Sequence, residues 1–350
     1  MKRFFIIALL LGSFESYSQT LGDFTPTTNP SFALGKAKGE KNIYIASFTV
    51  NYQVYNEKED FKQGGRAFGG GAYKGDALAA LSVGLTGISE QDVQSTTDKL
   101  YQDFLAMIKT KGLNVITADQ AGKADTYSDY TRLEGGRVSK SQYDGLLSVT
   151  PTGYSYYVKT VKKDGKEKKG GFLGQPHFVY GKLSKDLDDA IIANVELFVT
   201  FVKDKNAWGG AGANVKVETQ LRVAAVEGIV SKSDAKIKLK GQNSVEMVTS
   251  TVGFYRGKAG AGPETMHVGI LKKPLLINGV VESKKLQSFA ANRTDFTGTS
   301  AGLYTFYNPE NVKSTNSNVI QVDGAQYAKG TYEACKKLID HHTNEFFSKL

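Results

Sequence analysis

Cysteine is nearly absent from this chain: among 350 residues only Cys335 carries a thiol, so no intramolecular disulfide can form. Histidine is also scarce, with four residues, which leaves little material for a metal centre. The 7 prolines stand beside 38 glycines, which indicates many turns without a collagen-like or low-complexity bias. Beyond the N-terminus, no apolar run approaches the roughly 18 residues of a transmembrane helix.

The first 18 residues have the organisation of a secretory signal peptide. Lys2 and Arg3 form a positive start, and Phe4–Leu11 is an unbroken apolar run. The segment Ser16-Tyr17-Ser18 places small residues at the −3 and −1 positions, with Gln19 next. No cysteine follows the apolar run, so the lipobox of bacterial lipoproteins is missing. We therefore expect export by the general secretory route, to the periplasm, the outer membrane or the outside.

The chain is basic, with a formal net charge of +9. Removal of Lys2, Arg3 and Glu15 with the signal peptide subtracts two positive charges and one negative charge, leaving +8. Such a charge favours an acidic surface polymer, an anionic lipid or an envelope protein as partner, although a solvated basic surface gives the same number. Tyrosines and lysines interleave from Tyr154 to Lys169, but export argues against nucleic acid, and an exposed hairpin explains the pattern.

The N-terminal half predicts an α/β unit. Residues 19–40 are expected to form an extended leader, and residues 41–350 a single α+β domain with insertions. Ile43–Val50 is β-branched and aromatic and predicts a strand. A helix is expected near 90–111, capped by Ser89 with Asp92 and ended by Gly112, before a strand at 113–116. A strand, a helix and a strand in this order indicate a parallel pair.

The C-terminal half predicts a hairpin, several short strands and a final helix. Residues 190–202 and 215–226 are expected to pair across a glycine-rich turn. Residues 120–187 show no regular pattern apart from a lysine-rich hairpin tip at Lys162–Lys169. The last helix is expected to start at Asp323 or Gly324. We therefore expect an α+β fold whose mixed sheet is packed by helices and carries β-hairpin insertions.

The order of these elements resembles one envelope family. Residues 41–50, 104–118, 189–202, 213–226 and 329–350 are similar in order and pattern to the periplasmic α/β domain of the CsgG-like curli secretion channel lipoproteins, and to the TolB N-terminal-type fold. The matching segments cover about a third of the chain. The resemblance implies a cell-envelope role and ring assembly. Because the lipid-bearing cysteine is missing, it implies no acyl anchor.

One motif indicates catalysis. Gly298-Thr299-Ser300-Ala301-Gly302 matches G-x-S-x-G, in which the serine sits on a tight strand-to-helix turn. Gly69–Gly75 and Asp323-Gly324-Ala325 resemble the oxyanion loop and the aspartate motif of patatin-like lipases. Their spacing to Ser300 does not fit that family, and the neighbouring sequence favours a turn between short strands. A serine esterase using Ser300 is therefore kept as an alternative.

Cofactor and metal sites are not expected. His341 and His342 are adjacent on the final helix and point about 100° apart, so His342 is expected to pack and His341 to face water. Asp186, Asp188 and Asp189 indicate a polar entry to a strand, because a calcium loop needs more oxygen ligands.

The signal peptide and the resemblance indicate binding or assembly in the cell envelope without catalysis, including self-association. The second alternative, beside the esterase, is an oligomeric β-hairpin pore that inserts Gly64–Gly87 or the lysine-rich region near residue 165.

Overall fold

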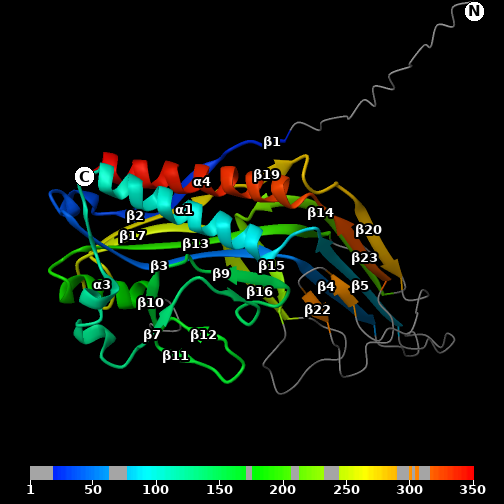
Figure 1. Cartoon of the computed structure of the whole chain (residues 1–350), viewed down its shortest axis with the longest axis horizontal. Helices are drawn as coiled ribbons and strands as arrows, with labels where there is room; N and C mark the ends of the chain where they lie inside the picture. The colour runs from blue at the N-terminus through cyan, green and yellow to red at the C-terminus, as the bar shows by residue number, and fades with distance from the viewer. Residues whose placement is uncertain are drawn as a thin grey trace, which may run out of the picture.

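The computed structural model describes residues 19–62, 77–170, 176–205, 213–231, 244–289, 299–301, 304–306 and 316–350. The expected signal peptide lies outside these residues. Figure 1 shows the chain as an elongated body with two long helices along one side of a large sheet.

Two long parallel strands form the spine of a 12-stranded mixed sheet. They are β3 (Asn42–Gln53) and β13 (Ile191–Lys205), which pair from Ile43–Ile191 to Tyr52–Val199. Both are rich in β-branched and aromatic residues, as a strand buried on both faces requires. The other edge of β13 is shared, because β17 (Thr251–Arg256) pairs with its first half and β14 (Asn214–Val223) with its second half.

The second edge of β3 is shared in the same way. β6 (Asn114–Ile116) pairs parallel with its start, and β9 (Leu146–Val149) pairs antiparallel with its end. The connection to β6 runs through α1 (Glu90–Thr110), so the expected parallel strand–helix–strand unit is confirmed. The expected hairpin of β13 and β14 is confirmed as well, with the inward residues of β14 alternating along the strand.

Residues 19–40 do not stand apart from the domain as a leader would. They form edge strands at opposite sides of the sheet, where β2 (Pro26–Phe32) pairs with β18 (Thr265–Leu271) and β1 (Thr20–Leu21) pairs with β19 (Leu275–Asn278). Pairing of backbone groups with distant strands leaves no pattern in the local sequence. The sequence of residues 19–40 therefore does not predict that they join the sheet. A short helix, η1 (Leu34–Ala37), follows β2, and the remaining sheet strands are β8 (Val138–Ser139) and β20 (Lys285–Phe289).

Two helices cover one face of the sheet, α1 and α4 (Gly324–Ser348) (Figure 1). Ser89 and Asp92 form a reciprocal capping box at the start of α1, and Gly112 follows its end with a φ of 77°. The Asp323 side chain accepts a hydrogen bond from the Gln326 backbone N–H at the start of α4. Both helices therefore begin where the sequence predicts.

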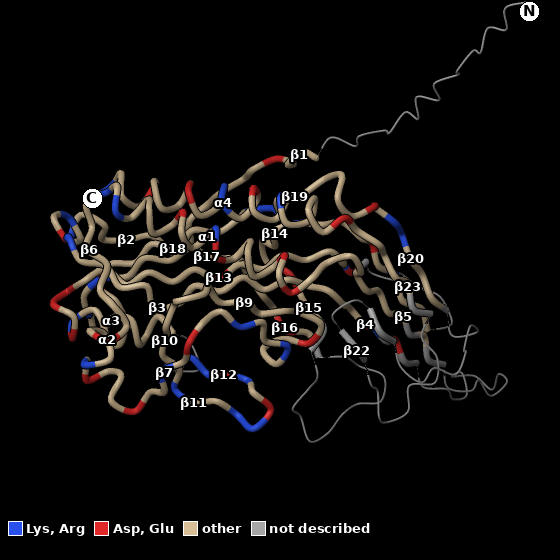
Figure 2. The backbone as a smooth tube through the Cα atoms, viewed as in Figure 1, with Lys and Arg blue, Asp and Glu red and all other residues tan. Residues whose placement is uncertain are grey.

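Short elements cover part of the opposite face. The region expected to be irregular contains α2 (Ala118–Ala121), η2 (Asp125–Tyr127), α3 (His177–Asp186), β7 (Thr131–Glu134) and β10 (Ser155–Val158). The lysine-rich tip is the turn between β11 (Thr160–Val161) and β12 (Glu167–Lys168), and Figure 2 shows basic and acidic residues mixed along this hairpin.

Among the described residues, three further small sheets are separate from the large one. A three-stranded sheet is ordered β23 (Asn316–Gln321), β5 (Ala77–Thr86), β4 (Tyr55–Lys62). A separate ribbon consists of β15 (Val226–Ser231) and β16 (Ser244–Thr249), and another of β21 (Thr299–Ala301) and β22 (Tyr304–Phe306). The mixed sheet, the packed helices and the hairpins confirm the α+β class.

Candidate functional site

Ser300 does not sit on a strand-to-helix turn. It lies inside β21, where it pairs with Thr305 of β22, so the segment after the serine returns as an antiparallel strand. A nucleophile elbow needs a helix directly after the serine, both to expose the hydroxyl and to supply N–H donors for an oxyanion. The backbone at Ser300 therefore lacks the geometry that the esterase alternative requires.

Of the two motifs that accompany Ser300, the aspartate motif alone falls within the described residues. Gly69–Gly75 lies outside the described residues. Asp323 uses its carboxylate to cap α4, which is a structural task at the end of a helix.

Two of the three aspartates before β13 are held by separate partners. Asp186 accepts hydrogen bonds from the backbone N–H and the hydroxyl of Thr126, at 2.8 and 2.5 Å. Asp189 pairs with Lys185 at 2.9 Å. Asp188 and Asp189 both have a positive φ, which marks the tight turn that enters β13. The cluster acts as a polar strand entry, as the sequence indicates.

The tyrosines of the mixed tyrosine–lysine segment pack on the protein. The Tyr154 ring stacks on Tyr156 with centroids 5.7 Å apart, and the Tyr157 ring stacks on Tyr127 at 4.4 Å. The Tyr157 hydroxyl donates a hydrogen bond to the Ala118 carbonyl. Packing on the protein therefore accounts for these rings without a base or a sugar as ligand.

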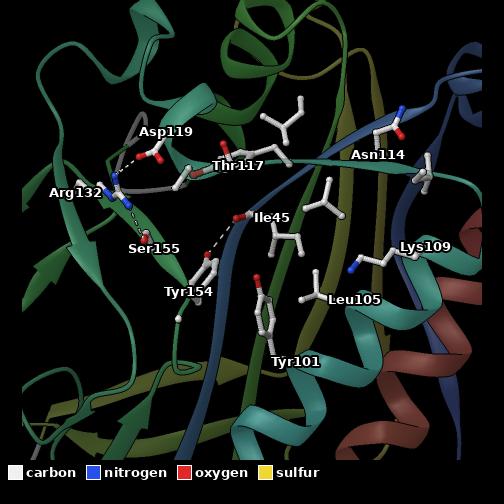
Figure 3. A pocket seen from close by; sticks show the side chains of 16 residues that line it. Ile45, Tyr101, Leu105, Lys109, Asn114, Thr117, Asp119, Arg132, Tyr154 and Ser155 are labelled. Atoms are coloured by element: carbon white, nitrogen blue, oxygen red, sulfur yellow. Dashed lines mark hydrogen bonds and ion pairs between the residues drawn. The ribbon is translucent and has the colours of Figure 1, made fainter.

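A pocket of about 690 Å³ opens beside β3 (Figure 3). Strand β3 pairs with β6 up to Tyr44 and with β9 from Val50 onward, and the pocket lies beside the interval between these two pairings. Figure 3 shows the Tyr154 hydroxyl reaching the Ile45 carbonyl there, at 3.2 Å. Tyr101 and Leu105 of α1 form the apolar side of the pocket, and burial raises the pKa of Tyr101 to about 12.

The polar side of the pocket is formed by Arg132. Its guanidinium pairs with Asp119 and with Glu134, and donates a hydrogen bond to the Ser155 hydroxyl at 3.0 Å. The lining contains neither histidine nor cysteine. The arrangement suits binding of a small ligand with an apolar body and a polar end, and offers no activated nucleophile.

A second site joins two histidines and a glutamate that the sequence does not place together. Among the described residues, His267 of β18 and His342 and Glu345 of α4 form a group whose ligand atoms all lie within 4.8 Å of one another. Both histidines are fully buried, and the side chain of Glu345 is 27% exposed. His341 faces water, as expected, yet its Nε2 lies 3.9 Å from the same Glu345 oxygen.

Burial sets the charge state of this cluster. It lowers the pKa of His267 to about 4 and lowers the pKa of His342 below its ordinary value. For Glu345 burial acts to raise the pKa, but the hydrogen bond from Lys349 and the nearby His342 imidazole outweigh it, and the pKa falls below its usual range. Near neutral pH the cluster therefore holds two neutral imidazoles and one carboxylate.

A local signal for part of this cluster exists in the sequence. His342 and Glu345 are three residues apart on a helix, which places both side chains on one face. The adjacent pair His341 and His342 is the more conspicuous pattern in the sequence, although these two side chains point in different directions. His267 belongs to a short strand far away in the sequence, and only the packing of β18 against α4 brings it near.

Comparison with known proteins gives no relative: the chain matches no family model, no curated protein and no solved structure. Among the described helices, none is long and apolar enough to cross a membrane.

Proposed function

We propose that the protein is an exported, non-catalytic component of the cell envelope that assembles with further copies of itself. The observation that carries this proposal is the apolar outer face of the ribbon β15–β16. Val226, Val245 and Met247 on this ribbon are 59%, 59% and 62% exposed. Large apolar side chains gathered on one exposed face are typical of an interaction surface.

The strand register puts these three residues on one face. Gly228 pairs with Met247, and Val226 pairs with Thr249, so Val226, Met247 and Val245 alternate with inward residues. The inward residues Ile229 and Val248 are buried in a small core with Phe198. One face of the ribbon therefore packs against the protein, and the other face is exposed to solvent.

A buried ion pair fixes the base of the ribbon. Arg222 is 2% exposed and donates two hydrogen bonds to Glu227, at 2.7 and 2.6 Å. A further guanidinium bond reaches the Val202 carbonyl, and Thr200 donates to Glu227. The two parallel hydrogen bonds of a bidentate pair fix the relative orientation of the two side chains as well as holding them together. The apolar face of the ribbon is therefore held in one orientation.

The edges of the ribbon support the same proposal. Among the described residues, β15 and β16 pair only with each other. A two-stranded ribbon is marginally stable by itself, and an open strand edge is a ready template for pairing with a strand of another chain. Assembly would cover the apolar face and satisfy these backbone groups together.

The other two functions receive less support. The backbone of Ser300 lacks the turn that an esterase needs. For a pore, the described part of the Gly64–Gly87 segment is β5, whose Leu81, Val83 and Leu85 are buried in the main core. Export itself rests on the signal-peptide pattern of residues 1–18, as does the expectation of an envelope partner or an acidic surface polymer.

The test begins with fractionation of the native host and intact mass measurement of the protein where it is found. Export predicts a mature chain that begins at Gln19. Native mass measurement is then made on the wild type, on V245E/M247E and on V161E/V319E. The last variant is the matched control, since Val161 and Val319 are 43% and 50% exposed on other elements.

We expect an oligomer for the wild type and for V161E/V319E, and a monomer for V245E/M247E. A monomeric wild type contradicts assembly. An oligomer that survives both changes on the ribbon contradicts the ribbon as its interface. A mass that includes residues 1–18 contradicts export.

A further inference from the structure

Three imidazoles surround one carboxylate oxygen at the C-terminal end of α4. Glu345 Oε2 lies 3.2 Å from His342 Nδ1, 3.8 Å from His267 Nε2 and 3.9 Å from His341 Nε2. Three of the four histidines of the chain therefore meet at a single acidic group. Histidine nitrogen and carboxylate oxygen are the donors that zinc takes in sites of the His₂Glu type.

The hydrogen bonds of His342 fix which nitrogen is free. Its Nε2 lies 3.1 Å from the Ile270 carbonyl, which can only accept, so Nε2 carries the hydrogen. In the neutral ring the lone pair is then on Nδ1, which faces Glu345 Oε2. Two acceptors would oppose each other at 3.2 Å, and a cation between them removes that repulsion.

His267 has the same arrangement on the strand side. Its Nδ1 hydrogen-bonds the Ser31 hydroxyl at 3.1 Å. Its Nε2 is buried without a hydrogen-bond partner among the described residues and lies toward Glu345. An imidazole whose outer nitrogen is held by a protein oxygen, leaving the inner nitrogen free, is typical of a metal ligand.

We propose that His267, His342 and Glu345 bind one divalent transition-metal ion of the zinc class. Tetrahedral coordination at ordinary zinc bond lengths places ligand atoms about 3.3 Å apart. The 3.2 and 3.8 Å separations from Glu345 are close to this value, and all three ligand atoms lie within 4.8 Å of one another, so side-chain movements would complete the site. His341, whose side chain is 41% exposed, has its Nε2 3.9 Å from the same Glu345 oxygen.

The backbone also makes room for this site. A Cβ atom at Gly269 would lie 2.0 Å from Cγ of His342, so only glycine lets the imidazole lie against β18. The ion would tie the end of α4 to β18 and, through Ser31, to the edge strand β2. It would thus act as a cross-link between three segments that are distant in sequence.

The test uses the full mature chain without an affinity tag, freed of metal by a chelator. Zn²⁺ is titrated by calorimetry and Co²⁺ by visible absorption, which reports four-coordinate geometry. We expect one equivalent of either ion and a raised melting temperature on binding. Glu345→Gln should abolish the stoichiometric site, while His177→Gln, which removes the one histidine that does not lie beside Glu345, should bind like the wild type.

A second variant covers the case in which changes at buried histidines prevent folding. Ser31 is exposed, so Ser31→Ala should fold, and loss of the outer hydrogen bond should weaken binding about 10–100-fold. Thr27→Ala on the same exposed strand should leave the affinity unchanged. Absence of saturable binding in the wild type would overturn the proposal. So would a Glu345→Gln variant that binds like the wild type, or equal losses in Glu345→Gln and His177→Gln.

Discussion

The two faces of the large sheet are covered in different ways. On one face, α1 and α4 pack aliphatic and phenylalanine side chains against β3, β13 and β17, with Phe346 stacked on Phe254 at 4.4 Å. On the other face, short elements pack tyrosines, and Tyr44, Tyr127 and Tyr180 belong to one buried cluster. The first face is held by long regular elements and apolar area, whereas the second combines ring packing with individual hydroxyl contacts.

Burial raises the pKa of Tyr44, Tyr127 and Tyr180 well above the usual range, so these three hydroxyls stay neutral even in alkaline solution. Each buried hydroxyl needs a partner, and Tyr180 finds one in Asn194. The helix face also holds a buried polar cluster, formed by His267, His342 and Glu345. We therefore expect changes in apolar volume on the helix face to lower the free energy of unfolding strongly. Changes at hydroxyls on the tyrosine face should lower it less.

The largest effect is expected for Phe104→Ala on the helix face. Phe104 is 1% exposed, and its ring lies 5.8 Å from that of Phe48. Removing a buried aromatic ring costs about 3–5 kcal/mol, since the cavity adds to the lost transfer energy. The free energy of unfolding in denaturant measures this loss. Leu105→Ala, at the half-buried neighbour beside the pocket, should cost less, and equal losses would contradict the assignment of Phe104 to the core.

The next effect is expected for Gly269→Ala, which adds one methyl group where the ring of His342 lies. Overpacking of this kind costs about 1–3 kcal/mol. Gly262→Ala is the matched control, because its added Cβ meets nothing within 4 Å, and it should be nearly neutral. Denaturation midpoints compare the two variants. Equal midpoints would show that His342 does not need the space above Gly269.

The same contrast between the faces explains what the sequence can predict. Helix α1 is visible because Val93, Leu100 and Phe104 recur at helical spacing between Ser89 and Gly112. The spine strands are visible because their apolar runs are long enough to exclude a surface location. Local periodicity and caps thus predict the helix face and the centre of the sheet.

The tyrosine face and the histidine cluster depend on contacts between distant segments. Helix α3 starts without a capping side chain, and β9 is four residues long, so neither gives a strong local signal. His267 and Glu345 meet only because α4 packs across β18. The pocket arises from a gap between the two partners of β3, a property of pairing that no local pattern encodes.

The smallest effect is expected for Tyr180→Phe on the tyrosine face. The Tyr180 hydroxyl donates a hydrogen bond to Asn194 Oδ1 at 3.1 Å, and both side chains are buried. The ring packing remains in phenylalanine, so the loss is that of one hydrogen bond, about 1 kcal/mol, measured again by denaturant unfolding. Tyr157→Phe should cost less, because its half-buried bond to the Ala118 carbonyl can be replaced by water. A Tyr180→Phe loss as large as that of Phe104→Ala would mean that hydroxyl contacts hold the second face as firmly as apolar volume holds the first.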